Sequence, residues 1–294
     1  MNKPRNLCFF FFLNPKEKFL NYKSFAIRTL VAAIFGPLVI LTALWGSWYW
    51  LGFIMLVALL SVYEFFDLAA KKAARGQLIW GLITAAALIL SFYFYEERHF
   101  FAIALISTIV MFFIEMYRRN GSPTLNLPTT FFGALFYSAA LGSFILIREL
   151  PARYGLDYGP AGKWLVLLIV AIWVCDTAAY IVGSYFGKHK LIERISPKKS
   201  IEGTAAGFIF AVISAYVCHI TFIQGLRLQD SLFIGAVAGS IGQYGDLFES
   251  MLKRDAGVKD SSHLIPEHGG ILDRFDSLTI SAPVIYLYLK YLAF

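Results

Sequence analysis

The sequence predicts an all-α integral membrane protein that crosses the bilayer several times. Of its 294 residues, 58% are hydrophobic and 15% are charged, whereas soluble globular chains carry about 25% charged residues. The apolar residues gather in long blocks, and the segments from Leu78 to Tyr95 and from Thr129 to Ile147 contain no charged side chain. An uncharged apolar block of about 18 residues is long enough to cross a bilayer as a helix.

About nine membrane-spanning helices are expected from these blocks. The fourth and ninth are the least well defined, because Glu115 lies late in the fourth and Lys290 lies within the short ninth. The expected spans are residues 28–45, 48–70, 78–95, 100–117, 129–147, 164–187, 204–225, 231–249 and 278–294.

The distribution of basic residues predicts a cytoplasmic N-terminus. With nine spans and the N-terminus inside, 20 of the 26 Lys and Arg residues fall in inner segments, as expected from the excess of basic residues in cytoplasmic loops. The chain then divides into a cytoplasmic tail (1–27), N-terminal transmembrane helices (28–147) and a C-terminal transmembrane region (164–294). The C-terminal region has two polar, basic cytoplasmic loops, at residues 188–203 and 250–277.

Other features of the composition carry less information. The apolar segment Leu7 to Leu13 is short and no small-residue cleavage site follows it, so we expect an interfacial or disordered tail and not a signal peptide. The net charge of +7 is attributed to basic loops facing anionic lipid and not to nucleic-acid binding. Cys8, Cys175 and Cys218 are too far apart for a metal-binding spacing.

The first group of polar residues lies at the end of the eighth span. On a helix, Asp246, Glu249, Ser250 and Lys253 fall on one face. A carboxylate there can bind a hard cation through oxygen, and the pair Lys253 and Arg254 can grip phosphate oxygens. The alternative is a helix end whose basic side chains reach the lipid headgroups.

The second group lies in the segment from Lys259 to Asp276. Its Pro and Gly-Gly interrupt any helix, and a new helix is expected to begin near Ile271. Asp273 and Asp276 are one turn apart with Arg274 beside them, and two such carboxylates repel unless a cation compensates. This arrangement suits a divalent metal bound to phosphates. The alternative is an acidic first turn that complements the helix dipole.

Together these residues resemble the signature of the phosphatidate cytidylyltransferase family. The shared pattern covers 27 residues, which makes it far more specific than a short glycine motif. It departs from many members at Glu267, where Gly is usual. The pattern reads Ser250-x-Leu252-Lys253-Arg254, Lys259-Asp260, and Ile265-Pro266-x-His268-Gly269-Gly270-Ile271-x-Asp273-Arg274-Phe275-Asp276.

A third group, around the sixth span, is also similar to this family. Asp176 lies near the middle of that span, where an ionisable residue is costly and usually functional. Gly183 and Gly187 form a Gly-x-x-x-Gly pair that favours close helix packing. Lys198 and Lys199 follow in the segment Ser196-Pro197-Lys198-Lys199-Ser200. They are either anchors at the membrane surface or, as the resemblance suggests, phosphate ligands.

The resemblance implies transfer of CMP from CTP to phosphatidate, giving CDP-diacylglycerol and pyrophosphate in phospholipid biosynthesis. It implies Mg²⁺, and a second metal ion is compatible with it. The expected partners are then CTP, phosphatidate and the lipid bilayer, and no nucleic acid is expected. The site is expected to face the cytoplasm at a bacterial inner membrane or its equivalent. A homodimer is compatible with the sequence. Asp246 and Asp273, with Asp276 behind them, are the expected metal ligands. Expected catalytic residues are Asp246, Lys253, Arg254, Lys259, Asp260, Asp273 and Arg274; expected substrate-binding residues are Asp176, Ser196, Lys198, Lys199, Ser250, His268, Gly269 and Gly270.

Two other functions are weighed against this one. A CTP-dependent kinase of a lipid alcohol would attack the γ-phosphorus and would need a base to activate its acceptor hydroxyl. A transporter would use Asp176 as an intramembrane ion site, but it would not need the segment from Lys259 to Asp276, and the sequence shows no inverted repeat.

Overall fold

The computed structural model describes residues 22–262, 264–265 and 269–294. The N-terminal tail expected up to residue 27 therefore lies mostly outside the described residues, and helix α1 already begins at Tyr22. The α-helices are α1 (Tyr22–Trp45), α2 (Ser47–Ala70), α3 (Leu78–Tyr95), α4 (Phe100–Tyr117), α5 (Pro123–Phe131), α6 (Ser138–Arg153), α7 (Gly159–Phe186), α8 (Ile201–Thr221), α9 (Leu228–Val237), α10 (Gln243–Asp255) and α11 (Leu272–Tyr288).

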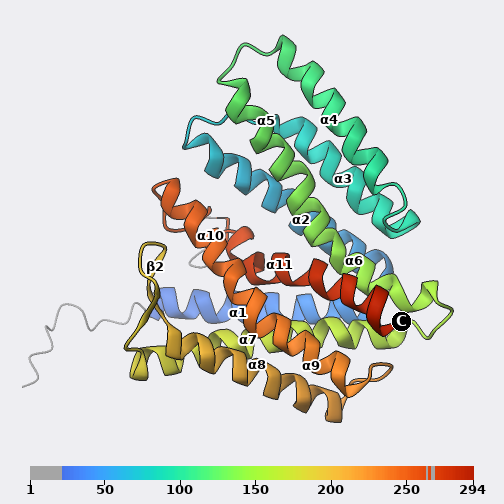
Figure 1. Cartoon of the computed structure of the whole chain (residues 1–294), viewed down its shortest axis with the longest axis vertical. Helices are drawn as coiled ribbons and strands as arrows, with labels where there is room; N and C mark the ends of the chain where they lie inside the picture. Colours follow the sequence, from blue (N-terminus) through green and yellow to red (C-terminus); the bar gives the residue numbers. More distant parts are fainter. Residues whose placement is uncertain (1–21, 263, 266–268) are drawn as a thin grey trace, which may run out of the picture.

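Three π-helical segments continue these helices without a break. The segment η1 (Phe132–Tyr137) joins α5 to α6, η2 (Ala238–Gly242) joins α9 to α10, and η3 (Leu289–Ala293) extends α11. The described residues thus form nine helical rods at the predicted positions, and the connections alternate between the two ends of the bundle (Figure 1). A polytopic membrane protein is confirmed, because six of the described helices are long and apolar enough to span a bilayer.

The rods extend beyond the predicted spans at several ends. Helix α6 reaches Arg153 instead of residue 147, and α10 reaches Asp255 instead of residue 249. Hydropathy marks where apolar residues stop, but a helix continues into the polar headgroup region when its last side chains tolerate water. The predicted loop 250–277 therefore begins with two turns of helix.

The other polar loop also contains regular structure. Strands β1 (Lys190–Ile192) and β2 (Ser196–Ser200) form an antiparallel hairpin within the predicted loop 188–203, so the fold is helical apart from these two short strands in the described residues. Ser200 then caps α8, where its Oγ accepts a hydrogen bond from Gly203 N at 3.2 Å. We call the end of the bundle that carries this hairpin the hairpin end.

Small residues bring α7, α8 and α9 into close contact. A Cβ atom at Gly203 would lie 2.6 Å from the Ala179 carbonyl oxygen, and one at Gly235 of α9 would lie 2.9 Å from the Ala211 carbonyl oxygen of α8. A Cβ atom at Gly183 would lie 3.5 Å from Gly203 Cα of α8, which confirms the packing role predicted for Gly183. These contacts fix the hairpin, which leads into α8, relative to α7.

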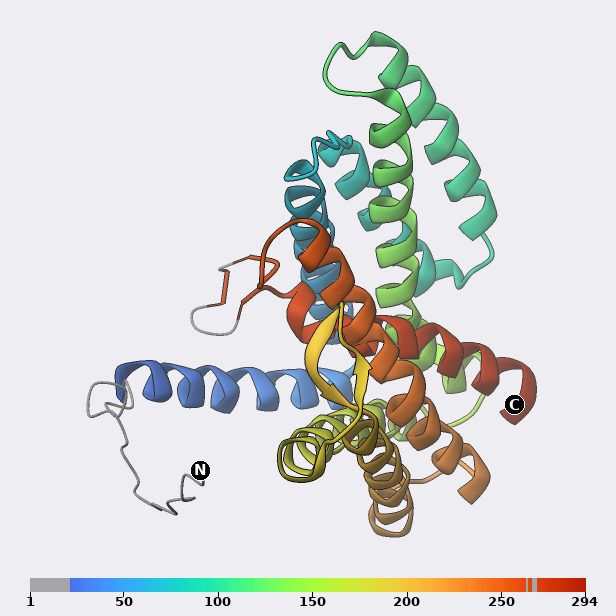
Figure 2. The same cartoon turned by 60° about the vertical axis from the view of Figure 1, so that its left-hand side comes forward.

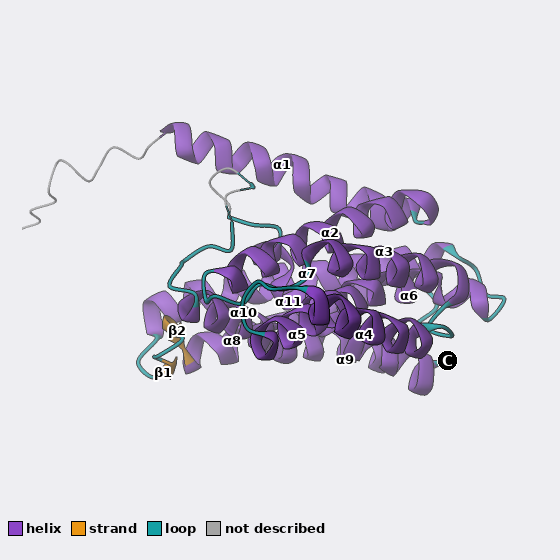
Figure 3. Cartoon of the chain, turned by 90° about the horizontal axis from the view of Figure 1, so that it is seen from above, coloured by secondary structure: helices purple, strands orange, loops and turns teal. Residues whose placement is uncertain are grey.

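Two groups of helices enclose α10 and α11. These two helices lie between α2–α6 on one side and α1 with α7 and α8 on the other (Figure 1). The buried core includes Trp50, Phe144 and Trp164, and Trp50 Nε1 donates to the Phe144 carbonyl at 3.2 Å. The beginning of α1 stands apart from the other helices (Figures 2 and 3), and Leu30 and Ile34 there are exposed.

Candidate active site

Charged side chains from four elements gather near the hairpin end. Asp176 comes from α7, Lys199 from β2, Asp246 from α10, and Asp273 and Asp276 from the first turns of α11. All five residues were predicted from the sequence to belong to the site. The structure places Lys199, from the segment 188–203, against Asp246, which lies just before the segment 250–277.

Asp246 and Lys199 form the contact between the hairpin and α10. Lys199 Nζ lies 2.5 Å from Asp246 Oδ2, and Ser250 Oγ donates to Asp246 Oδ1 at 3.3 Å. About a quarter to a third of each charged side chain is exposed. The pair is therefore reached by solvent, and an incoming phosphate or cation can compete for either partner.

Lys253 forms a second and more buried ion pair with α11. Its Nζ lies 2.5 Å from Asp273 Oδ1 and 3.3 Å from Glu249 Oε1. Burial opposes the charge of this ammonium, but Glu249 and Asp273 outweigh that effect and hold the pKa of Lys253 above its usual value. The carboxylate oxygens of Glu249 are buried and make no hydrogen bond among the described atoms.

The remaining oxygen of Asp273 is held by the loop that precedes α11. Asp273 Oδ2 accepts hydrogen bonds from Ser261 N at 2.9 Å, Ser261 Oγ at 2.9 Å and Gly270 N at 2.8 Å. Burial opposes ionisation of this carboxyl, yet the surrounding donors, Lys253 and Gly270 N among them, keep the pKa of Asp273 well below its usual range. Asp273 is thus a fixed anion whose orientation is set by the loop.

Backbone geometry explains the two glycines of the signature. Gly269 has a φ of +82°, a conformation that side chains other than Gly rarely adopt. A Cβ atom at Gly270 would collide with Ser261 Oγ and with a carboxylate oxygen of Glu64. Both glycines were predicted to bind substrate, and the structure gives each a conformational or packing reason to lack a side chain.

Glu64 of α2 is the site residue that sequence reasoning missed. It is fully buried and accepts hydrogen bonds from Ser262 Oγ at 2.6 Å and Leu272 N at 2.8 Å. A signal was present, because Glu64 is an acidic residue inside a predicted transmembrane span, where ionisable residues are usually functional. No pattern in the sequence indicated its partners.

Asp276 and Asp176 add two carboxylates to the same recess. Burial, with the nearby Asp246 charge second, raises the pKa of Asp276 to about 7. Asp176 is exposed although it lies well inside α7, and its charged neighbours are Asp246, Lys199 and Arg274. The recess therefore holds several carboxylates beside cationic side chains.

Other predicted site residues lie further from this recess. The exposed Arg254 donates to the Val258 carbonyl at 3.1 Å. Lys259 and Asp260 line a pocket of about 550 Å³ with Tyr63, Glu64 and Asp67 of α2 and with Lys71, which follows α2. Ser196 and the exposed Lys198 lie on β2, and His268 lies outside the described residues.

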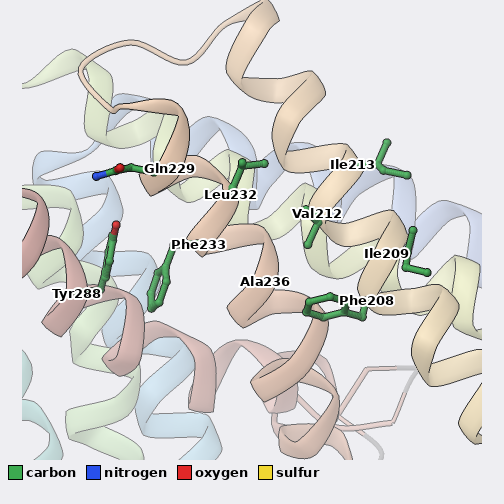
Figure 4. Close-up of a pocket in the computed structure, with 9 residues that line it drawn as sticks. All are labelled: Phe208, Ile209, Val212, Ile213, Gln229, Leu232, Phe233, Ala236 and Tyr288. Atoms are coloured by element: carbon green, nitrogen blue, oxygen red, sulfur yellow. The ribbon is translucent and has the colours of Figure 1, made fainter.

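Figure 4 shows a separate apolar groove of about 550 Å³ between α8, α9 and the end of α11. Phe208, Phe233 and Tyr288 are among the residues that line it, and none of the predicted site residues does. This groove is therefore distinct from the charged recess.

The donor chemistry of the recess suits a hard divalent cation. In the part of the chain that the structure describes, no three His, Cys, Asp or Glu side chains converge on one metal position. Mg²⁺ is usually held by one or two carboxylates together with waters and substrate phosphates. Asp246 with Asp273 or Asp276 can supply such a partial set.

Comparisons with known proteins agree with the signature. The model of the cytidylyltransferase family matches residues 26–292. The phosphatidate cytidylyltransferase of Thermotoga maritima is 30% identical over 270 residues, which cover 90% of this chain and 96% of that protein. The phosphatidate cytidylyltransferase of Bacillus subtilis is 36% identical over 193 residues, 66% of this chain and 67% of the relative. The resemblance predicted from the sequence is confirmed.

Proposed function

The chain belongs to the cytidylyltransferase family, and we propose that it transfers CMP from CTP to phosphatidate. A phosphate oxygen of the lipid forms a bond to the α-phosphorus of CTP. The bond from that phosphorus to the bridging oxygen breaks, and pyrophosphate leaves with the electron pair. The products are CDP-diacylglycerol and pyrophosphate.

The observation that carries this proposal is the charged recess in a membrane protein. Both substrates are polyanions, so the principal barrier is bringing them together and stabilising charge on the leaving group. The lipid phosphate is already ionised near neutral pH and needs no strong base. Lys199, Lys253 and Arg274 lie where cationic groups can bind phosphate oxygens, and the carboxylates beside them keep these cations in place.

Mg²⁺ is the proposed cofactor, held by Asp246 and Asp273, with Asp276 nearby. When bound, the ion would neutralise phosphate oxygens and stabilise the pyrophosphate as it leaves. Lys199 and Lys253 now contact Asp246 and Asp273, so each ammonium is placed to turn toward phosphate when the carboxylates bind a cation. A second metal ion is also part of the proposal, because Asp276 and Asp176 add further carboxylates close to Asp246.

The pocket at the end of α2 is the proposed position for part of CTP. Lys259 can bind a phosphate there, and Asp260 can orient the basic side chains. The pocket borders Ser261, which itself binds Asp273. A nucleotide seated in it would thus lie beside the fixed carboxylate.

Nine spans with a cytoplasmic N-terminus complete the proposal. The nine helical rods and the strong excess of Lys and Arg at one end support this topology. It places the recess at the inner leaflet, where cytosolic CTP and the lipid headgroup can both reach it. A homodimer is also proposed, as an arrangement compatible with the sequence.

CTP labelled at either the α- or the γ-phosphorus tests the function. Purified enzyme is mixed with phosphatidate in detergent micelles, and label in the lipid fraction is measured. The proposal predicts that α-label enters lipid and γ-label appears in pyrophosphate. Transfer of γ-label to lipid would identify a kinase instead, and turnover of neither label would leave a transporter as the better interpretation.

A further inference from the structure

A buried carboxylate links the N-terminal half of the molecule to the loop that carries Asp273. Glu64 lies on α2, about 200 residues before its partners, and its side chain is fully inaccessible to solvent. Glu64 borders the pocket proposed for part of CTP, but its carboxylate is closed off from that pocket by the groups that it binds. Any influence on the reaction must pass through the groups that it binds.

The four partners that the structure describes all belong to the signature segment from Ser250 to Asp276. Oε1 accepts from Ser262 Oγ at 2.6 Å and from Ile271 N at 3.0 Å, while Oε2 accepts from Ser261 Oγ at 3.1 Å and from Leu272 N at 2.8 Å. An ionised carboxylate offers about four lone-pair positions, so its acceptor capacity is filled. A neutral amide in its place would have to turn a donor toward other donors.

Glu64 also replaces the missing cap of α11. The first N–H groups of a helix have no partner within the helix, and Ile271, the residue at the cap position, makes no side-chain capping bond. Glu64 supplies acceptors to Ile271 N and Leu272 N from a different helix. The first turn of α11, which carries Asp273, is thus anchored to α2.

A single hydroxyl connects Glu64 to Asp273. Ser261 Oγ lies 3.1 Å from Glu64 Oε2 and 2.9 Å from Asp273 Oδ2, so its one hydrogen is shared between the two carboxylates. The absence of a side chain at Gly270 makes room for this contact. Displacing Glu64 would therefore release Ser261 and the backbone at Ile271 and Leu272. These groups set the direction in which Asp273 Oδ1 points.

We propose that Glu64 is a positioning residue for cytidylyl transfer, which holds Asp273 in the orientation that binds the cation and nucleotide. This inference rests on the proposed function. Partners that orient metal ligands from behind typically change metal affinity or activity by about 10–100-fold when they are removed. We expect an effect of that size from Glu64→Gln.

The test compares Glu64→Gln and Glu64→Asp with the wild-type enzyme. Turnover of α-labelled CTP is measured across a Mg²⁺ titration, and amide hydrogen exchange is measured for the peptide containing Ile271 and Leu272. Glu115→Gln is the matched control, because Glu115 is a buried carboxylate of α4 whose partners Gln77 and Asn126 lie outside the site. The control is expected to lower thermal stability without changing the Mg²⁺ dependence.

We predict that Glu64→Gln raises the half-activating Mg²⁺ concentration and lowers kcat by about 10–100-fold, with faster exchange at Ile271 and Leu272. Glu64→Asp, which keeps the charge, should lie between wild type and Gln. Unchanged kcat and Mg²⁺ dependence in Glu64→Gln overturns the proposal; if that variant does not fold, wild-type behaviour of Glu64→Asp in every measurement overturns it. If the wild-type enzyme transfers no CMP, the proposed function is wrong, but amide hydrogen exchange still shows whether Glu64 holds the first turn of α11.

Discussion

Replacing Lys199 by Met separates a catalytic role from a structural one. Lys199 Nζ lies 2.5 Å from Asp246 Oδ2, but both side chains remain partly exposed, at 26% and 32%. Ion pairs that solvent reaches contribute about 0.2–1 kcal/mol to stability. The variant should therefore lose at most about 1 kcal/mol, a shift of only a few degrees in Tm for a chain of this size.

The expected effect on activity is much larger. An oriented donor that stabilises charge in a transition state typically contributes about 2.7–4 kcal/mol, or roughly 100- to 1,000-fold in kcat. Met keeps the length of the Lys199 side chain and removes its charge. We therefore predict at least about a 100-fold loss of CMP transfer, measured with α-labelled CTP at saturating Mg²⁺, in a protein that unfolds near the wild-type temperature.

The control is Lys72→Met, at an ion pair between the turn after α2 and the end of α10. Lys72 Nζ lies 3.3 Å from Asp255 Oδ1, and both side chains are more exposed than those of the Lys199 pair. This variant should keep wild-type activity. The reasoning is refuted if Lys199→Met retains activity within threefold of Lys72→Met, or if its loss of activity is matched by a comparable loss of folded protein.

Three further predictions concern groups around the recess. Because the pKa of Asp276 is raised to about 7, its carboxyl takes up a proton as the pH falls below 7. The half-activating Mg²⁺ concentration should therefore rise by up to about tenfold between pH 7 and pH 6. A half-activating concentration that does not change with pH in the wild type, or that changes equally in Asp276→Asn, would contradict this prediction. Gly270→Ala should abolish CMP transfer, since its Cβ would collide with Ser261 Oγ and Glu64; activity above a tenth of wild type would show that the loop can shift. Gly203→Val should lower Tm by several degrees, because a Cβ there lies 2.6 Å from the Ala179 carbonyl oxygen and larger groups force helices apart, by about 1–3 kcal/mol; an unchanged Tm in a thermal unfolding scan would argue against tight α7–α8 packing.

Much of the fold could be predicted because bilayer helices have a simple signal. A long apolar block such as Leu78 to Tyr95 must be helical in lipid, since every backbone polar group needs an internal partner, and α3 has these same limits. The hairpin end was harder. The segment from Ser196 to Ser200 has no apolar alternation that would indicate a strand, and its pairing with residues 190–192 is a tertiary outcome.

Part of the candidate site could also be predicted, because residues one helical turn apart leave a local pattern in the sequence. Helical spacing placed Asp246 beside Ser250, and the structure joins them at 3.3 Å. The contact of Lys199 with Asp246 was not predicted as a residue pair. The sequence predicted only that the segments 188–203 and 250–277 face each other. Glu64 could not be connected to Ser261, because a contact between residues 197 positions apart leaves no local pattern in one sequence.

Catalysis by the carboxylates of the recess is the central claim, and CMP transfer in two amide variants tests it most directly. Asp246→Asn and Asp273→Asn each keep the size of the side chain and remove the charge that would bind a cation. With α-labelled CTP, phosphatidate and Mg²⁺, the wild type should form labelled CDP-diacylglycerol, and both variants should form almost none while remaining folded. Near-normal formation of labelled lipid by both variants would contradict the assignment of the active site.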